Sequence, residues 1–83
     1  MRENVLKIKY PDHMLFSLKE TRENFEQEAR FLLAMKFYEL GKISSGTAAE
    51  IAEMSRVRFL MKLGQYHVTM FQEDLDEIIS ESK

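Results

Sequence analysis

Residues 42–66, KISSGTAAEIAEMSRVRFLMKLGQY, predict two short helices joined by a tight turn. The first helix contains Ala48, Ala49 and Ala52, whose small side chains allow a second helix to cross at close range. Ser55 is a suitable N-cap for the second helix, and Gly64 is a suitable end. Two helices arranged in this way form a helix-turn-helix, which places its second helix in the major groove of DNA.

The second helix of this segment has a cationic face. At about 100° per residue, Arg58 and Lys62 share one side, where they repel each other unless an anion such as DNA phosphate is present. The N-cap of the first helix is either Ser44 or Thr47, and Ser44 and Ser55 are further candidates for phosphate contacts. Arg56 falls among the apolar angles but in the exposed first turn, and it is the candidate for a base contact, because arginine pairs bidentately with guanine. The alternative is that these charges are only solvated surface groups.

A long helix is predicted over residues 21–40. Thr21 is a suitable N-cap, and Gly41 is a suitable stop signal. The second half of this helix, FLLAMKFYEL, is apolar on nearly all sides, which indicates burial on more than one face. A chain of 83 residues has little core of its own to cover two faces. We therefore expect Phe31, Met35 and Tyr38 to contact a partner, most simply in a homodimer.

The two ends of the chain predict short extended segments and one more helix. Residues 4–10 and residues 67–71 have the composition of β-strands, which could pair with each other or across a dimer. Residues 13–19 fit either a second strand or a turn of helix. Residues 73–82 predict a short acidic amphipathic helix, with Leu75, Ile78 and Ile79 on one side. The expected fold is one mainly α domain over residues 1–83, with a helix-turn-helix after a long helix and short strands near both ends.

Composition argues against several classes of function. There is no cysteine, and His13 and His67 are the only histidines, so neither a metal site nor a cofactor is expected. No constellation of nucleophile and base indicates an enzyme. Charge is uneven, with four bases against two acids in residues 42–67 and five acids against one base in residues 72–83. The acidic end is either a solvated tail or, with its apolar residues, a docking element for a basic protein.

The run KFYELGKISSGTAAEIAEMSRVRFLMKLGQYHVTMFQED, residues 36–74, resembles the UPF0175 family of small prokaryotic proteins. Glu53 stands where that family usually has glycine, and Arg58 stands where acidic residues are frequent. The resemblance implies a cytoplasmic antitoxin that binds its operator DNA as a dimer and binds a toxin, often a PIN-type ribonuclease. The alternative that it leaves open is a module that neutralises a toxin without binding DNA.

Overall fold

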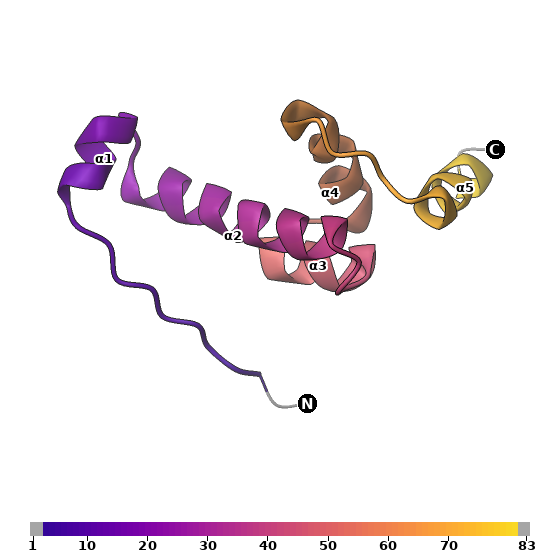
Figure 1. The fold of residues 1–83 in the computed structure, drawn as a ribbon, viewed down its shortest axis with the longest axis horizontal. Helices are drawn as coiled ribbons and strands as arrows, with labels where there is room; N and C mark the ends of the chain where they lie inside the picture. Colours follow the sequence, from indigo (N-terminus) through magenta and orange to yellow (C-terminus); the bar gives the residue numbers. More distant parts are fainter. Residues whose placement is uncertain (1–2, 82–83) are drawn as a thin grey trace.

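The computed structural model describes residues 3–81, which form five α-helices and one 3-10 helix. In chain order these are α1 (His13–Leu18), α2 (Arg22–Glu39), α3 (Ser45–Ala52), α4 (Arg56–Lys62), η1 (Leu63–Tyr66) and α5 (Gln72–Glu81) (Figure 1). The prediction of a mainly helical chain is confirmed. The long helix α2 lies beside α3, and α4 packs next to α3, so these three helices form the body of the molecule.

The prediction of β-strands near both ends is wrong, because residues 3–81 contain no strand. Residues 4–10 are extended, but a strand also needs a neighbouring backbone to accept and donate its hydrogen bonds. Residues 67–71 instead connect η1 to α5: His67 turns the chain at φ 59°, and the Phe71 carbonyl accepts the first bonds of α5. The sequence left residues 13–19 open between a strand and a turn of helix, and residues 13–18 form the short helix α1.

Helix α2 begins and ends where the sequence predicts. The Thr21 hydroxyl accepts a hydrogen bond from the Asn24 amide at 3.1 Å, which satisfies one of the free N–H groups at the helix start. Gly41 has φ +75°, a conformation that glycine adopts without a steric penalty, and it turns the chain toward α3. Only one stripe of α2 is fully buried, at Phe31, Ala34 and Tyr38.

Helices α3 and α4 are separate, with a short turn between them. Ser44 is the cap of α3 and accepts from the Thr47 amide at 3.2 Å, while Ser55 caps α4 by accepting from the Arg58 amide at 3.2 Å. Between the helices, Glu53 has φ 57° and ψ 47°, the left-handed conformation in which a side chain is strained. A glycine at this position would avoid that strain.

Aromatic rings attach α4 to α2. The Phe59 ring lies 5.3 Å from the Phe31 ring and 5.7 Å from the Tyr38 ring, measured between centroids. The full set of buried apolar residues is Phe31, Ala34, Tyr38, Ala48, Ala49, Ala52, Phe59, Leu60 and Leu63. This core fixes α4 with its inner face on α2 and α3, and with its outer face free.

The helical path continues beyond the expected end at Gly64. Helix α4 ends at Lys62, but η1 carries the chain through Gly64 to Tyr66, and His67 makes the turn. Tyr66 donates to a Glu28 carboxylate oxygen at 3.0 Å and so holds η1 on α2. Over the residues that the structure describes, no helix has the length and apolarity needed to cross a bilayer.

We predict that the free energy of unfolding of Glu53→Gly exceeds that of Glu53→Ala by about 1 kcal/mol, because only the alanine keeps a Cβ in the left-handed conformation. Both variants lose the exposed ion pair with Arg30, so their difference isolates the backbone term. Urea unfolding followed by circular dichroism measures it. Equal stability of the two variants would show that Glu53 is not strained.

Candidate nucleic-acid interface

The outer face of α4 combines two cations with apolar side chains. Phe59 and Leu60 are buried, whereas Val57 and Met61 are 45% and 66% exposed. Arg58 lies on the exposed side with them. Because α4 is held by its buried residues, this outer face is a fixed surface of the protein.

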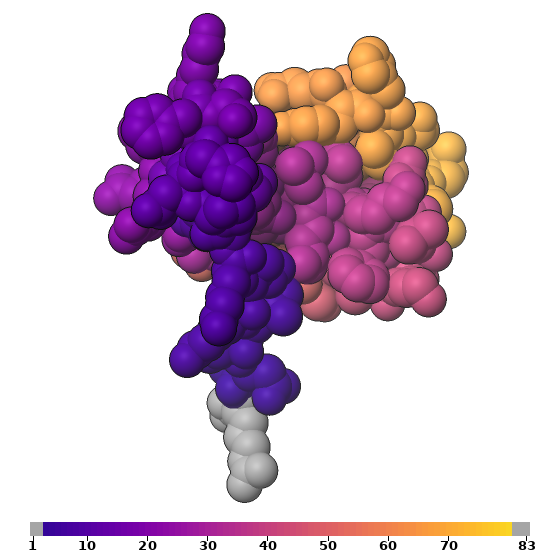
Figure 2. Space-filling model, turned by 60° about the vertical axis from the view of Figure 1, so that its left-hand side comes forward, coloured from indigo at the N-terminus to yellow at the C-terminus, as the bar shows by residue number. Residues whose placement is uncertain are grey.

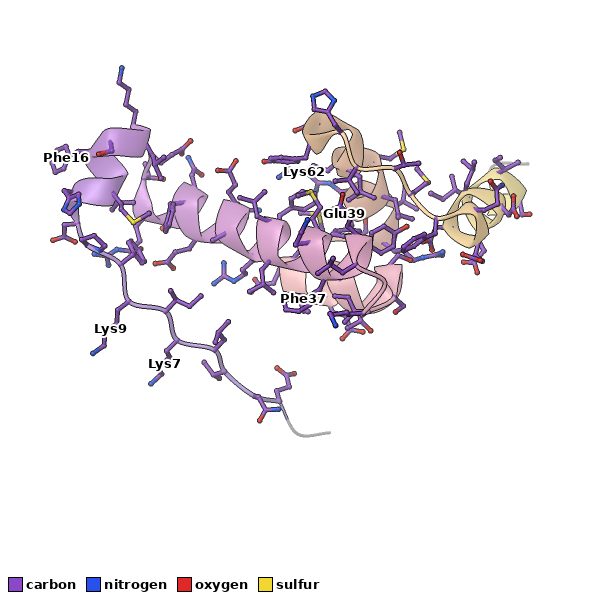
Figure 3. All side chains as sticks on the ribbon, in the orientation of Figure 1. Lys7, Lys9, Phe16, Phe37, Glu39 and Lys62 are labelled. Atoms are coloured by element: carbon purple, nitrogen blue, oxygen red, sulfur yellow. The ribbon has the colours of Figure 1, made fainter. Side chains whose placement is uncertain are left out.

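Arg58 and Lys62 are not neutralised by neighbours. No described carboxylate forms an ion pair with either side chain. The ammonium of Lys62, which is labelled in Figure 3, lies 4.6 Å from the centre of the Phe31 ring of α2, a contact that leaves its charge in place. A shallow recess beside them contains no acid and is lined by Gln27, Met54, Arg58, Met61, Lys62 and Gln65. We call Arg58 and Lys62 with this recess the cationic face.

The position of Arg56 in the first turn of α4 indicated an exposed side chain, but its guanidinium is hydrogen-bonded within the protein. Its Nε donates to the Ser45 hydroxyl at 2.8 Å, and its Nη2 donates to Asp74 at 2.9 Å. Glu77 also pairs with the same nitrogen. Only 28% of the side chain is exposed. The hydrogen bond to Asp74 raises the pKa of Arg56, although burial acts in the opposite direction.

Asp74 is the centre of this cluster. Its carboxylate accepts from the Tyr38 hydroxyl at 2.5 Å and from the Ser45 hydroxyl at 2.7 Å, in addition to Arg56. The Tyr38 oxygen in turn accepts from the Phe71 amide at 2.8 Å. We call Tyr38, Ser45, Arg56, Asp74 and Glu77 the Asp74 network. It joins α5 to α2, α3 and α4, and so holds the acidic helix against the helix pair.

The network changes the titration of its members. Burial alone would raise the pKa of Asp74, but the hydrogen bonds from Tyr38, Ser45 and Arg56 together hold it below its ordinary value. Burial, and then the hydrogen bond to Asp74, raise the pKa of Tyr38 to about 12. Tyr38 therefore keeps its proton and stays a donor at neutral pH, while Asp74 stays an acceptor.

Sequence reasoning missed the Asp74 network. Ser45 and Asp74 are 29 positions apart, and Tyr38 and Asp74 are 36 apart, so no local spacing connects them. Ser45 lies next to an N-cap and Asp74 lies in the first turn of a helix, and local helix preferences alone explain a polar residue at the one position and an acid at the other. The one available signal was Arg56 among the apolar angles of α4, because a cation on an inner face needs a buried partner.

The two serines keep the positions expected for caps. Ser44 and Ser55 are both exposed, and both use their oxygen to accept a backbone amide. Ser44 also donates to the Thr47 hydroxyl at 3.2 Å. Among the residues that the structure describes, no three His, Asp or Glu side chains are grouped so that they could hold a metal ion.

Of the six residues expected at a partner contact, two have substantial free surface. Phe31 and Tyr38 are 0% and 1% exposed, because the chain's own core takes up their rings. Met35 and Ile78 are partly buried against that core. Leu75 and Ile79, on α5, are 36% and 48% exposed. Among these six residues, the two on α5 are therefore the open ones, whereas the apolar surface that α2 and its C-cap leave open lies at Phe37 and Leu40, which are 41% and 55% exposed.

Comparison with known proteins gives a family for the whole chain. Residues 1–83 match the sequence model described as "Uncharacterised protein family (UPF0175)". A curated protein of Archaeoglobus fulgidus, described as "UPF0175 protein", is 36% identical over 73 residues, which are 88% of this chain and 80% of that protein. No solved structure matches the chain. The resemblance seen in residues 36–74 is confirmed and extends over the full length.

We predict that Asp74→Asn lowers the free energy of unfolding at pH 7 by about 1–3 kcal/mol, because Arg56 loses its least exposed anionic partner. Asp76→Asn, on the exposed side of the same helix, should change it by less than about 0.5 kcal/mol. Chemical unfolding measures both. An Asp74→Asn variant as stable as Asp76→Asn would show that the network does not hold α5.

The same carboxylate predicts a pH dependence. The folded pKa of Asp74 is depressed, so its contribution is present above its unfolded pKa of about 4 and is lost as the pH falls through the folded value. The stability difference between the wild type and Asp74→Asn should therefore shrink between pH 5 and pH 2.5, measured by urea unfolding at each pH. A difference that stays constant over this range would contradict the assignment.

Proposed function

The chain belongs to the UPF0175 family, and on this premise we propose that it is a DNA-binding antitoxin that binds its own operator as a dimer. The observation that carries the proposal is the cationic face. Arg58 is exposed and Lys62 is half-buried one turn further along α4, a short helix that follows a three-residue turn, and no described carboxylate pairs with either cation. A cationic helix surface without neighbouring acids favours a polyanionic ligand.

Each side chain of α4 has a separate part in this proposal. Phe59 and Leu60 hold the helix on the body, so that its outer face can enter a major groove without a change of fold. Arg58 and Lys62 contact phosphates and supply the salt-dependent part of the affinity. Val57 and Met61 are exposed beside them and suit contacts with thymine methyl groups. Ser55, whose hydroxyl oxygen accepts from the Arg58 amide, can donate its proton to a further phosphate, whereas Ser44 would first have to release its hydrogen bond to Thr47.

The proposal gives Arg56 a positioning role in place of a base contact. A contact with guanine needs a free guanidinium, and that of Arg56 donates to Ser45 and Asp74. Releasing it would leave Asp74 without its cation in a partly buried site. Arg56 therefore sets the position of α4 relative to α5, and the phosphate-binding cations are Arg58 and Lys62.

A second candidate is a module that neutralises a toxin without binding DNA. The observation that favours it is the outer side of α5, where Leu75 and Ile79 are exposed beside Glu73 and Asp76. An apolar stripe flanked by acids suits a basic protein surface, such as the active-site region of a ribonuclease. Both candidates place the protein in the cytoplasm with a toxin, and they differ in whether the cationic face has a ligand.

We predict that the protein binds the DNA upstream of its own gene. Replacing both Arg58 and Lys62 by alanine should weaken the dependence of this binding on salt concentration. Each lost phosphate contact lowers the slope of log K against log salt concentration by about 0.9, so the double variant should lose about 1.8. Fluorescence anisotropy between 50 and 200 mM salt measures the slope, with an unrelated duplex of equal length for comparison.

Lys36→Ala is the matched control, because this lysine is exposed on α2 and already pairs with Glu39 at 3.0 Å. Its slope should equal that of the wild type. An unchanged slope in the Arg58 and Lys62 double variant would remove both residues from the interface. A wild-type protein that binds neither duplex but inhibits the neighbouring toxin would favour the second candidate.

A further inference from the structure

The first described residues form an arm that the rest of the chain does not cover. Residues 3–9, which we call the arm, extend away from the helices (Figures 1 and 2). Val5, Leu6 and Ile8 are 80%, 69% and 66% exposed. Lys7 and Lys9 alternate with them and point away from the helices (Figure 3). Three neighbouring aliphatic side chains in water are unusual for a small monomer and indicate a binding segment.

The arm is fixed at its base. The Tyr10 ring lies 4.7 Å from the Phe25 ring, measured between centroids, and the Tyr10 hydroxyl donates to Glu26 at 2.6 Å. These contacts hold residue 10 on α2, and residues 3–9 can span about 23 Å when extended. A segment with an anchored base, three exposed aliphatic side chains and two lysines against one acid, Glu3, can dock on another surface without a rearrangement of the body.

The outer side of α5 complements the arm in both apolarity and charge. Leu75 and Ile79 are one turn apart and therefore share a side, with Phe71 exposed just before the helix. Helix α5, Gln72–Glu81, has the sequence QEDLDEIISE and contains no base. Glu73 and Asp76 are exposed. Since the Asp74 network holds α5 on the body, this side is a preformed surface that can receive aliphatic side chains flanked by lysines.

We propose that the arm of one chain docks on the outer side of α5 of a second copy, and that the exchange is reciprocal. Figure 1 places α1, from which the arm extends, and α5 at opposite ends of the molecule, which favours docking between chains. Two chains that each give an arm and receive one form a closed, twofold dimer and bury both apolar surfaces. The inference supplies the dimer contact of the proposed function but does not rest on DNA binding, and it is tested without DNA.

Charge reversal on each side provides the test. One variant carries Lys7→Glu and Lys9→Glu, and the other carries Glu73→Lys and Asp76→Lys; all four positions are exposed and lie outside the core and the Asp74 network. Each variant alone should dimerise at least about tenfold more weakly than the wild type, because like charges then face each other in both contacts. Mixed in equal amounts, the two should form a heterodimer, since every arm then faces a surface of opposite charge. Sedimentation equilibrium measures all three samples.

Phe16→Ser is the control, because this ring is 84% exposed on α1 but lies outside the arm, and its dimer affinity should stay at the wild-type value. Circular dichroism verifies that every variant keeps its helices. A wild-type chain that stays monomeric, an arm variant that dimerises normally, or a mixture of the two variants that stays monomeric would each overturn the proposal. DNA binding by a chain that proves monomeric would leave the role of Arg58 and Lys62 intact, so the two failures are distinguishable.

Discussion

The arrangement of this protein depends on one carboxylate that accepts hydrogen bonds from three other helices. The carboxylate of Asp74, in the first turn of α5, accepts hydrogen bonds from Tyr38 of α2, Ser45 of α3 and Arg56 of α4. A partly buried carboxylate with three donors stabilises its charged form, and its loss leaves an arginine with only an exposed partner. Through this contact the acidic helix becomes part of the fold.

This constraint also determines which charges remain available for binding. Asp74 and Glu77 pair with Arg56, while no described carboxylate pairs with Arg58 or Lys62, about half a turn and nearly two turns further along. The acids of α5 therefore neutralise the start of α4 and leave its outer face cationic. A net charge of −2 conceals this division, because the cationic and the acidic surfaces lie on different helices of one small chain. The proposed DNA contact and the proposed dimer contact use these two surfaces separately.

Local features of the fold could be predicted from the sequence, and non-local ones could not. The caps at Thr21 and Ser55 and the turn at Gly41 were predicted correctly, because each depends on residues within one helical turn. The strands were predicted wrongly, since residues 4–10 have strand composition but no backbone beside them to complete a ladder. The position of Arg56 needed the contact with Asp74, 18 residues away, which helical periodicity does not contain. The family, by contrast, was recognisable from residues 36–74 alone.

In the proposed complex the cationic face of α4, and not the acidic helix or the arm, contacts DNA. Titration of the isotopically labelled protein with its upstream DNA, followed by amide chemical shifts in NMR spectra, tests it most directly. If α4 contacts DNA, the largest shifts are expected at Ser55, Arg58, Met61 and Lys62, with little change in the residues of α5 that follow Asp74. Shifts concentrated in α5 or in residues 3–9, with α4 unchanged, would contradict it.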